Sequence, residues 1–270
     1  MFGSILPVLE TKMSCPPPFG WFHMMWFAII ILTPIILHEK DGQYSERKLK
    51  TILGTYSIVA FSLEFLKQVI YSAEYILTTG TIVWDFQWYA APFQLCTTPI
   101  YACLVAFCLD EDSKLRKHLL SYVAFITILG SIATLFYPGD CFTENIIVNI
   151  HTTWLHFGSL IVSIYLAMSK TVELNTQSLI RAIKTFVAFV CIAQILNIGV
   201  YQSGILNGET FNMFYISPYF VSSLPVFKQI YQNVPYPVFL LSYIGVLSLG
   251  GYLVFIAEKF IVKERKIHEA

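Results

Sequence analysis

The sequence carries unusually little charge. Only 13% of its 270 residues are Asp, Glu, Lys or Arg, whereas soluble domains carry about 25%. Too few charges remain to cover the surface of an ordinary soluble domain, so that class is excluded. The 17 basic residues are balanced by 17 acidic ones. Because no excess of positive charge is available to bind nucleic acid, we expect no nucleic-acid partner.

Paired cysteine motifs are also missing. The six cysteines contain no C-x-x-C motif, which excludes a zinc knuckle and a dithiol redox motif. We expect neither a bound metal nor a cofactor. What the chain has in abundance is apolar surface, since 56% of the residues are hydrophobic and the mean hydropathy is +0.64. This composition predicts a polytopic membrane protein.

Seven apolar stretches are long enough to cross a membrane as helices, which need about 20 residues. No internal repeat is visible, and no gap between the stretches is large enough for a soluble domain. We therefore predict an all-α fold, a bundle of seven transmembrane helices in which residues 1–270 form a single membrane domain. The stretches lie at about 19–37, 51–72, 88–109, 118–137, 146–168, 183–204 and 235–257.

Basic residues are concentrated in alternate connections between these stretches. Fourteen of the 17 Lys and Arg residues lie in segments 38–50, 110–117, 169–184 and 258–270. Cytoplasmic loops of membrane proteins carry such an excess. Seven spans with this bias predict that the N-terminus lies outside and the C-terminus inside. The connection at 205–234 then lies outside, and its length favours a short interfacial helix or a re-entrant segment.

Polar side chains from four of the spans share one level. At 1.5 Å of rise per residue, Glu64, Cys96 and His156 lie roughly 12–15 Å from the outer ends of their spans. Asn197 and Gln194 lie within about 10–15 Å of the same surface. Ionisable residues inside a membrane are costly, so each is a candidate for a functional site. A common level is what one buried site would require.

The ionisable residues also have structural explanations. Glu64 and Lys67 are three residues apart on one helix and can pair with each other. His156 can bond to a neighbouring helix. His151 lies about 140° from His156 around the helix, so the two imidazoles do not easily face one site. We expect His151 to be solvated near the interface.

Cys96 differs from the other cysteines because Pro92 and Pro99 flank it. A proline within a helix frees backbone carbonyls and bends the axis, which can open a polar cavity. Cys15 and Cys141 lie outside the predicted spans on the outer side, and a disulfide between them is one alternative. The rest are expected to act as small hydrophobic residues, namely Cys103, Cys108 and Cys191.

If the shared level holds a site, Cys96 and His156 are its natural catalytic pair. A thiol attacks an ester only as the thiolate, and an imidazole within hydrogen-bond distance can take its proton. The same imidazole can return the proton to a leaving group or activate an acceptor alcohol. A site in the outer part of the bilayer would meet the ester carbonyls of phospholipids. The pattern therefore points to acyl chemistry on lipids.

Several short motifs follow one another in order over nearly the whole chain. They are Pro18-Phe19-Gly20 with His23, Phe93-Gln94-Leu95-Cys96, Leu155-His156, Asn212-Met213-Phe214-Tyr215-Ile216-Ser217-Pro218 and Pro235-Tyr236-Pro237. Together they resemble the bacterial YwaF-type integral membrane proteins. That family is in turn similar to a eukaryotic transmembrane acyltransferase that moves polyunsaturated acyl chains onto ether lysophospholipids. The resemblance implies an acyltransferase in a bacterial plasma membrane, with an intracellular eukaryotic membrane as the alternative.

The resemblance assigns the catalytic roles to Cys96 and His156. The sequence also departs from the family at two positions. Gln94 stands where many members have His, and Ser217 stands where Lys is common. The headgroup preference of the relatives is therefore not carried over. We expect substrate-binding or supporting roles for five residues, which are Glu64, Gln94, Asn197, Asn212 and Tyr215.

Three classes of function compete for this sequence. The leading hypothesis is an acyltransferase or transacylase acting on phospholipids and lysophospholipids, and water as the acceptor would make the same site a lipid hydrolase. A transporter or flippase would use Glu64, Lys67, Asn197 and Gln194 to line a path, although no clear inverted repeat is present. A seven-span sensor is the third class, but span seven contains no Lys for a retinal Schiff base.

Overall fold

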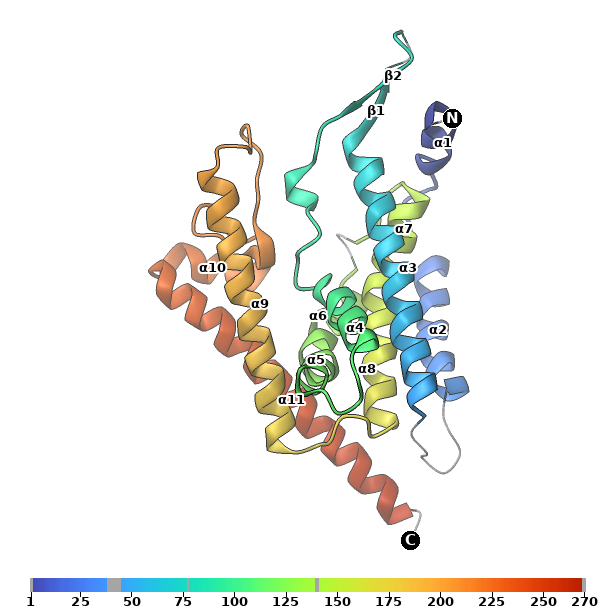
Figure 1. Ribbon diagram of the computed structural model, residues 1–270, viewed down its shortest axis with the longest axis vertical. Coiled ribbons are helices and arrows are strands. Elements are labelled where there is room, and N and C mark those ends of the chain that lie inside the picture. The colour runs from blue at the N-terminus through green and yellow to red at the C-terminus, as the bar shows by residue number, and fades with distance from the viewer. Residues whose placement is uncertain (1, 38–44, 77, 139–140, 269–270) are drawn as a thin grey trace.

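The chain folds into a bundle of helices (Figure 1). Helix α1 (Phe2–Leu9) lies at one end of the bundle and the C-terminal part of α11 (Tyr236–His268) at the opposite end. The computed structural model describes residues 2–37, 45–76, 78–138 and 141–268.

Five helical segments of the described residues are long and apolar enough to cross a membrane. They are Glu46–Ser72 (helix α3), Lys114–Phe136, Ile146–Met168, Thr176–Gln202 (helix α9) and Tyr236–Ile261 of α11. Two further apolar helices are shorter, α2 (Trp21–Leu37) and α4 (Thr98–Cys108). The structure therefore confirms a mostly helical protein with several membrane-spanning helices. The count of seven spans and their orientation stay predictions.

Two of the long segments contain a π-turn, in which one extra residue widens the helix. Helix α5 (Lys114–Tyr122) passes through Val123–Thr127 into α6 (Ile128–Phe136), and α7 (Ile146–Thr153) passes through Trp154–Gly158 into α8 (Ser159–Met168). A π-turn displaces backbone hydrogen bonds and is frequent at functional sites.

Side chains satisfy the carbonyls at both π-turns. The carbonyl of Val123 accepts hydrogen bonds from Thr127 Oγ1 at 2.9 Å and from Ser163 Oγ, on α8, at 2.8 Å. The Tyr56 hydroxyl, on α3, donates to the Leu155 carbonyl at 3.2 Å, and Trp154 Nε1 donates back to the Tyr56 carbonyl at 3.2 Å. These bonds join α8 to the first π-turn and α3 to the second.

The third predicted span, 88–109, is only partly correct. Strands β1 (Ala73–Ile76) and β2 (Thr81–Trp84) form an antiparallel hairpin that projects from the end of α3 (Figure 1). A single 3-10 turn at Trp88–Ala90 follows, residues 91–97 are not helical, and α4 begins only at Thr98.

The prolines explain this late start of α4. Pro99 stands in the first turn of the helix, where its missing N–H has no helical partner in any case. Pro92 lies in the non-helical segment. The expectation that Pro92 and Pro99 bend a continuous helix around Cys96 is therefore wrong. Cys96 lies in a turn that precedes the helix, so a depth counted along a helix does not apply to it.

Side chains cap the N-termini of four long helical segments. Each accepts a hydrogen bond from the backbone N–H three residues later, an N–H that the helix itself leaves unpaired. The distances are 3.4, 3.5, 3.0 and 2.9 Å for Ser45, Ser113, Asn145 and Asn175, at the starts of α3, α5, α7 and α9.

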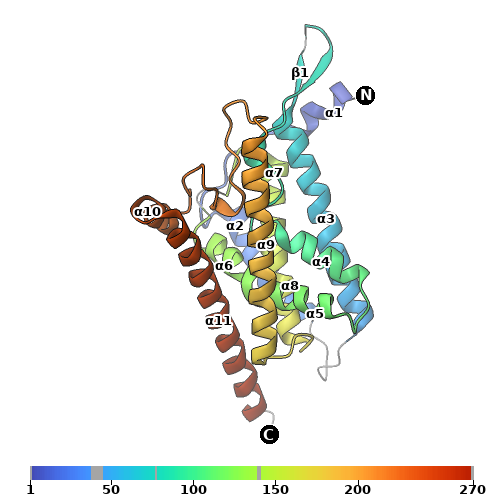
Figure 2. The same cartoon turned by 60° about the vertical axis from the view of Figure 1, so that its left-hand side comes forward.

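The connection between α9 and α11 contains two short helical elements, a 3-10 turn at Met213–Tyr215 and helix α10 (Pro225–Asn233). Figure 2 shows α9 and α11 side by side, with this connection at the end of the bundle where α9 finishes. Met213 and Phe214 are completely buried. The connection thus turns back into the bundle before it reaches α10.

Helix α11 packs closely on the first π-turn through a glycine. A Cβ atom added to Gly251 would lie 3.3 Å from the Phe125 carbonyl oxygen and in contact with the end of the Ile126 side chain. Gly245, two turns earlier on the same helix, would meet nothing within 4 Å. Gly251, unlike Gly245, therefore lies where α11 approaches the π-turn closely.

We expect Gly251→Leu to lower the free energy of unfolding by about 1–3 kcal/mol, because the larger side chain overpacks the contact with the Val123–Thr127 turn. The midpoint of thermal unfolding of the protein in detergent measures this effect. Gly245→Leu is the matched control and should leave the midpoint unchanged or raise it. Equal losses in the two variants would contradict the assigned contact.

Candidate functional site

A buried carboxylate joins α3 to α7. Glu64 is 4% exposed, and its Oε2 lies 2.7 Å from Nε2 of His151. Its Oε1 pairs with Nζ of Lys67. The predicted pairing of Glu64 with Lys67 is confirmed. The expectation that His151 is solvated is wrong, because the residue is 5% exposed and bonded to Glu64.

The same cluster holds the non-helical segment before α4. Lys67 Nζ donates a hydrogen bond to the Ala90 carbonyl at 3.0 Å, and Gln68 Nε2 donates to that carbonyl as well. Gln68 Nε2 also lies 3.4 Å from Glu64 Oε1. Buried charges persist only when they are paired and hydrogen-bonded, and this cluster satisfies both conditions.

The Glu64 bond also sets the chemistry of His151. The carboxylate accepts a hydrogen bond from Nε2 of His151 and so orients the imidazole ring. Its Nδ1 is buried and has no hydrogen-bond partner among the described residues.

His156 bonds to a different helix. It lies in the π-turn Trp154–Gly158, and its Nδ1 is 3.2 Å from Oγ1 of Thr134 on α6. His151, in contrast, bonds to Glu64 on α3. The two imidazoles therefore have partners on different helices, in agreement with their angular separation along the chain. In each imidazole, one ring nitrogen is hydrogen-bonded to a side chain of another helix.

Cys96 is a free, partly buried thiol in the turn that precedes α4. The non-helical segment that carries it is anchored to the Glu64–Lys67 pair through the Ala90 carbonyl, six residues before Cys96. Within the part of the chain that the structure describes, the Cys96 sulfur forms no hydrogen bond with His156. Among the described residues, Cys15 and Cys141 form no disulfide with each other.

Two side-chain amides clamp the backbone around Met213. Gln94 Nε2 donates to the Asn212 carbonyl at 3.0 Å, and Gln94 Oε1 accepts from the Phe214 N–H at 2.8 Å. Asn197 Nδ2 donates to the Met213 carbonyl at 3.0 Å, and Asn197 Oδ1 accepts from the Met213 N–H at 2.7 Å. The side chains of the predicted supporting residues Gln94 and Asn197 are thus hydrogen-bonded to backbone groups.

Neighbouring polar residues continue this arrangement. Asn212 Oδ1 accepts from the Ser217 N–H at 2.8 Å. The Tyr236 hydroxyl donates to the Ile216 carbonyl at 2.7 Å, and Gln194 Nε2 bonds to that hydroxyl. Asn212 and Gln194 therefore hold the connection in place. The sequence predicts a substrate-binding or supporting role for Asn212 and a place for Gln194 at the level of the candidate site.

The clamped backbone is strained. Phe214 and Tyr215 have φ angles of 59° and 58°, in the left-handed region that side chains other than glycine rarely adopt. Such conformations cost free energy and cluster at functional sites. The electrostatic influence of Cys96 reaches Tyr215, and burial raises the pKa of Tyr215 to about 12. Its hydroxyl is therefore protonated at neutral pH and remains a hydrogen-bond donor.

A family model matches residues 18–255, which is most of the chain, and its description is TMEM164 family. The chain belongs to the TMEM164 family. Comparison with curated proteins found no match. Comparison with solved structures found none either. This TMEM164-family protein is therefore a multi-pass membrane protein, and the resemblance to bacterial YwaF-type proteins stays a prediction.

Sequence reasoning misses one candidate site residue of the TMEM164-family chain, His151. The angular separation of His151 and His156 predicts that they do not easily face one site, but it does not specify which imidazole faces it. A signal was available, since His151 and Glu64 both lie within a few turns of the outer ends of their predicted spans. A buried carboxylate needs a partner, and an imidazole at the same level can provide one.

We expect Glu64→Leu to lower the free energy of unfolding by about 3–5 kcal/mol, because it leaves the buried Lys67 ammonium without a counter-charge. Chemical denaturation in detergent measures this change. The double variant Glu64→Leu with Lys67→Met removes both charges and should recover a large part of the loss. A double variant no more stable than Glu64→Leu alone would contradict the assigned ion pair.

We expect Asn197→Leu to cost about 1–3 kcal/mol for each Met213 backbone group that it leaves buried without a partner. Hydrogen exchange of residues 211–217 should also become faster, because the clamp is lost. Gln202→Leu, at the exposed end of α9, is the matched control and should change neither measurement. Unchanged exchange in Asn197→Leu would show that the clamp does not hold this segment.

Proposed function

We propose that the protein is an integral membrane acyltransferase or transacylase that moves a fatty acyl chain between phospholipids through an acyl-thioester on Cys96. The observation that carries the proposal is the place of Cys96, a free thiol on a non-helical segment that the Glu64–Lys67–His151 cluster anchors at the Ala90 carbonyl. The motif resemblance to an acyltransferase supports it independently.

The proposed reaction has two steps. The Cys96 thiolate attacks the ester carbonyl of a donor phospholipid, a sulfur–carbon bond forms, and the ester carbon–oxygen bond breaks. The leaving lysophospholipid alkoxide takes the proton that the thiol gave to the base. The hydroxyl of an acceptor lysophospholipid then attacks the thioester and returns the thiol. Water in place of the acceptor makes the enzyme a hydrolase, with the same residues.

A histidine is the proposed general base. His156, with its Nδ1 held by Thr134, is the base that the sequence predicts. His151, oriented by Glu64, is the second candidate for the same role. The Tyr215 hydroxyl is the proposed donor to the developing oxyanion, because it stays protonated and lies within the electrostatic reach of Cys96.

The setting of the reaction is also proposed. The basic connections support a cytoplasmic C-terminus, and we propose that the thiol faces the outer part of the membrane. The bacterial resemblance favours a plasma membrane, with an intracellular eukaryotic membrane as the alternative. A transporter is disfavoured because Glu64, Lys67 and Asn197, which would line its path, bond to one another or to backbone.

The first test incubates the purified protein with palmitoyl-oleoyl phosphatidylcholine and deuterated lysophosphatidylcholine. We expect acyl transfer to the labelled lysolipid, and an acyl mass on the intact protein that hydroxylamine removes. Cys96→Ala should lose both signals, since no thioester can form. Cys103→Ala, which removes a buried thiol on α4, is the matched control and should keep both. Transfer by Cys96→Ala at the wild-type rate would refute the proposal.

The second test identifies the base. We expect His156→Ala to lower the rate of acyl transfer by about 10²–10⁴-fold, the usual contribution of a positioned base. His118→Ala, on α5 and bonded to Thr185, is the control and should retain activity. If His151→Ala loses this activity and His156→Ala keeps it, the Glu64–His151 pair is the base and the assignment of His156 is wrong.

A further inference from the structure

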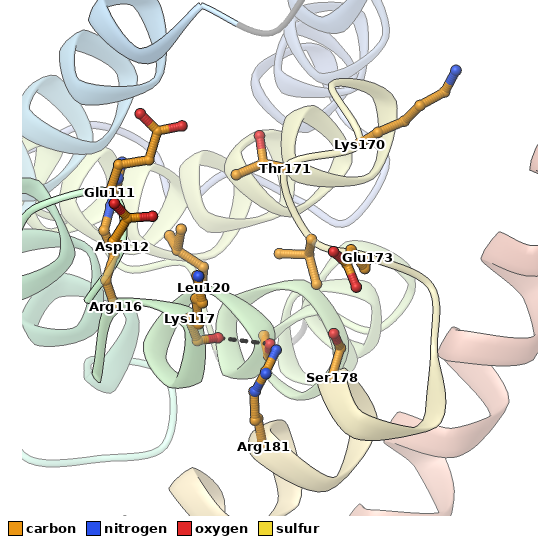
Figure 3. Close-up of a pocket in the computed structure, with 12 residues that line it drawn as sticks. Glu111, Asp112, Arg116, Lys117, Leu120, Lys170, Thr171, Glu173, Ser178 and Arg181 are labelled. Atoms are coloured by element: carbon orange, nitrogen blue, oxygen red, sulfur yellow. Dashed lines mark hydrogen bonds between the residues drawn. The ribbon is translucent and has the colours of Figure 1, made fainter. Parts of the chain in front are cut away.

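A polar cavity lies where α5 and α9 begin (Figure 3). Its volume is about 310 Å³. Residues of two segments line it, 111–121 at the start of α5 and 170–181 at the start of α9. The cavity shares no residue with the proposed acyl-transfer site, so an inference about it does not rest on that function.

Ser178 provides the first indication of a ligand. The residue is 1% exposed, and its backbone N–H donates to Asn175 Oδ1 at 2.9 Å. Its hydroxyl forms no hydrogen bond with any residue that the structure describes, and Figure 3 shows it pointing toward the other lining residues. A buried hydroxyl without a protein partner is costly unless a ligand or water satisfies it.

The position of Ser178 favours an anion. It lies in the first turn of α9, a helix of 27 residues, whose N-terminal N–H groups and dipole favour negative charge. Arg181 and Lys117 extend from α9 and α5 into the same cavity (Figure 3). Neither forms an ion pair with an acidic group of the described residues, so both cations are available to an anionic ligand.

Carboxylates limit which anion fits. Glu111 and Asp112 line the cavity at a distance from Ser178 in Figure 3, and Glu173, whose carboxylate accepts a hydrogen bond from Asn175 Nδ2 at 2.6 Å, lies closer to it. They repel a bare anion but accept hydrogen bonds from hydroxyl groups. A ligand that carries a phosphate at one end and hydroxyl groups at the other can bind the cations and Ser178 with its phosphate and donate hydrogen bonds to the carboxylates with its hydroxyl groups.

We infer that this cavity binds a polyol phosphate, with the phosphate at Ser178, Arg181 and Lys117 and the hydroxyl groups at Glu111 and Asp112. Two sources share this chemistry, a glycerophosphate headgroup of a membrane lipid and a soluble glycerol phosphate. The lipid source is consistent with the position of the cavity between two of the basic connections, 110–117 and 169–184, where headgroups would meet the protein.

The test is calorimetric titration of the full-length protein in phosphate-free detergent buffer. The probes are sn-glycerol 3-phosphate, inorganic phosphate and dihexanoyl phosphatidylglycerol. We expect binding of the glycerol phosphates, and a loss of about tenfold in affinity in Arg181→Gln and in Ser178→Ala, because each removes a hydrogen bond to a charged group. Lys117→Gln, at an exposed position, provides the same test if Arg181→Gln does not fold.

Control variants test whether the cavity is required, and a comparison of the two glycerol phosphates identifies the source of the ligand. Lys184→Gln and Lys114→Gln remove one cation each from the same helices outside the cavity and should change the affinity by less than about twofold. The double variant Glu111→Gln with Asp112→Asn should weaken sn-glycerol 3-phosphate relative to inorganic phosphate. Tighter binding of dihexanoyl phosphatidylglycerol than of sn-glycerol 3-phosphate identifies the lipid headgroup, and equal binding identifies the soluble compound.

Two results would overturn the inference. One is the absence of binding by both glycerol phosphates. The other is an equal loss of affinity in the cavity variants and in the control variants, which would show that binding follows the overall charge of this end of the protein and not the cavity.

Discussion

The arrangement of the bundle depends on one constraint, that polar backbone groups inside it must be hydrogen-bonded. Helices satisfy this internally, but the segment before α4 and the turn at Met213–Tyr215 are not helical. Side-chain amides complete their hydrogen bonding, with Gln94 on Asn212 and Phe214, and Asn197 on Met213. Irregular backbone can therefore lie among the helices, and it is this backbone that carries Cys96 and Tyr215.

The buried ionic cluster serves the same purpose. Lys67 and Gln68 both donate to the Ala90 carbonyl, so the cluster that neutralises Glu64 also anchors the irregular segment to α3. Because Glu64 bonds to His151 as well, α7 is joined to the same point. A thiol on backbone held in this way has a fixed position relative to the helices, which the proposed catalysis by a thiol–imidazole pair would need.

Some features of this organisation follow from local sequence. The bounds predicted for the fifth span, 146–168, coincide with those of the observed segment, and the pairing of Glu64 with Lys67 follows from their spacing on a helix. The start of α4 was not predictable from hydropathy, because residues 91–97 are mostly apolar although they are not helical. Hydropathy measures whether a segment can enter an apolar region, and it does not specify the backbone conformation there.

By itself the sequence determined the class of the protein and the location of its apolar helices, because composition and hydrophobic length act over contiguous residues. It also identified the polar residues that must find partners. Only the tertiary structure decided which partners they find. His151 bonds to Glu64, His156 to Thr134, and Asn197 to the Met213 backbone. These contacts join residues far apart in the chain, and their geometry depends on how the helices pack, which no local pattern encodes.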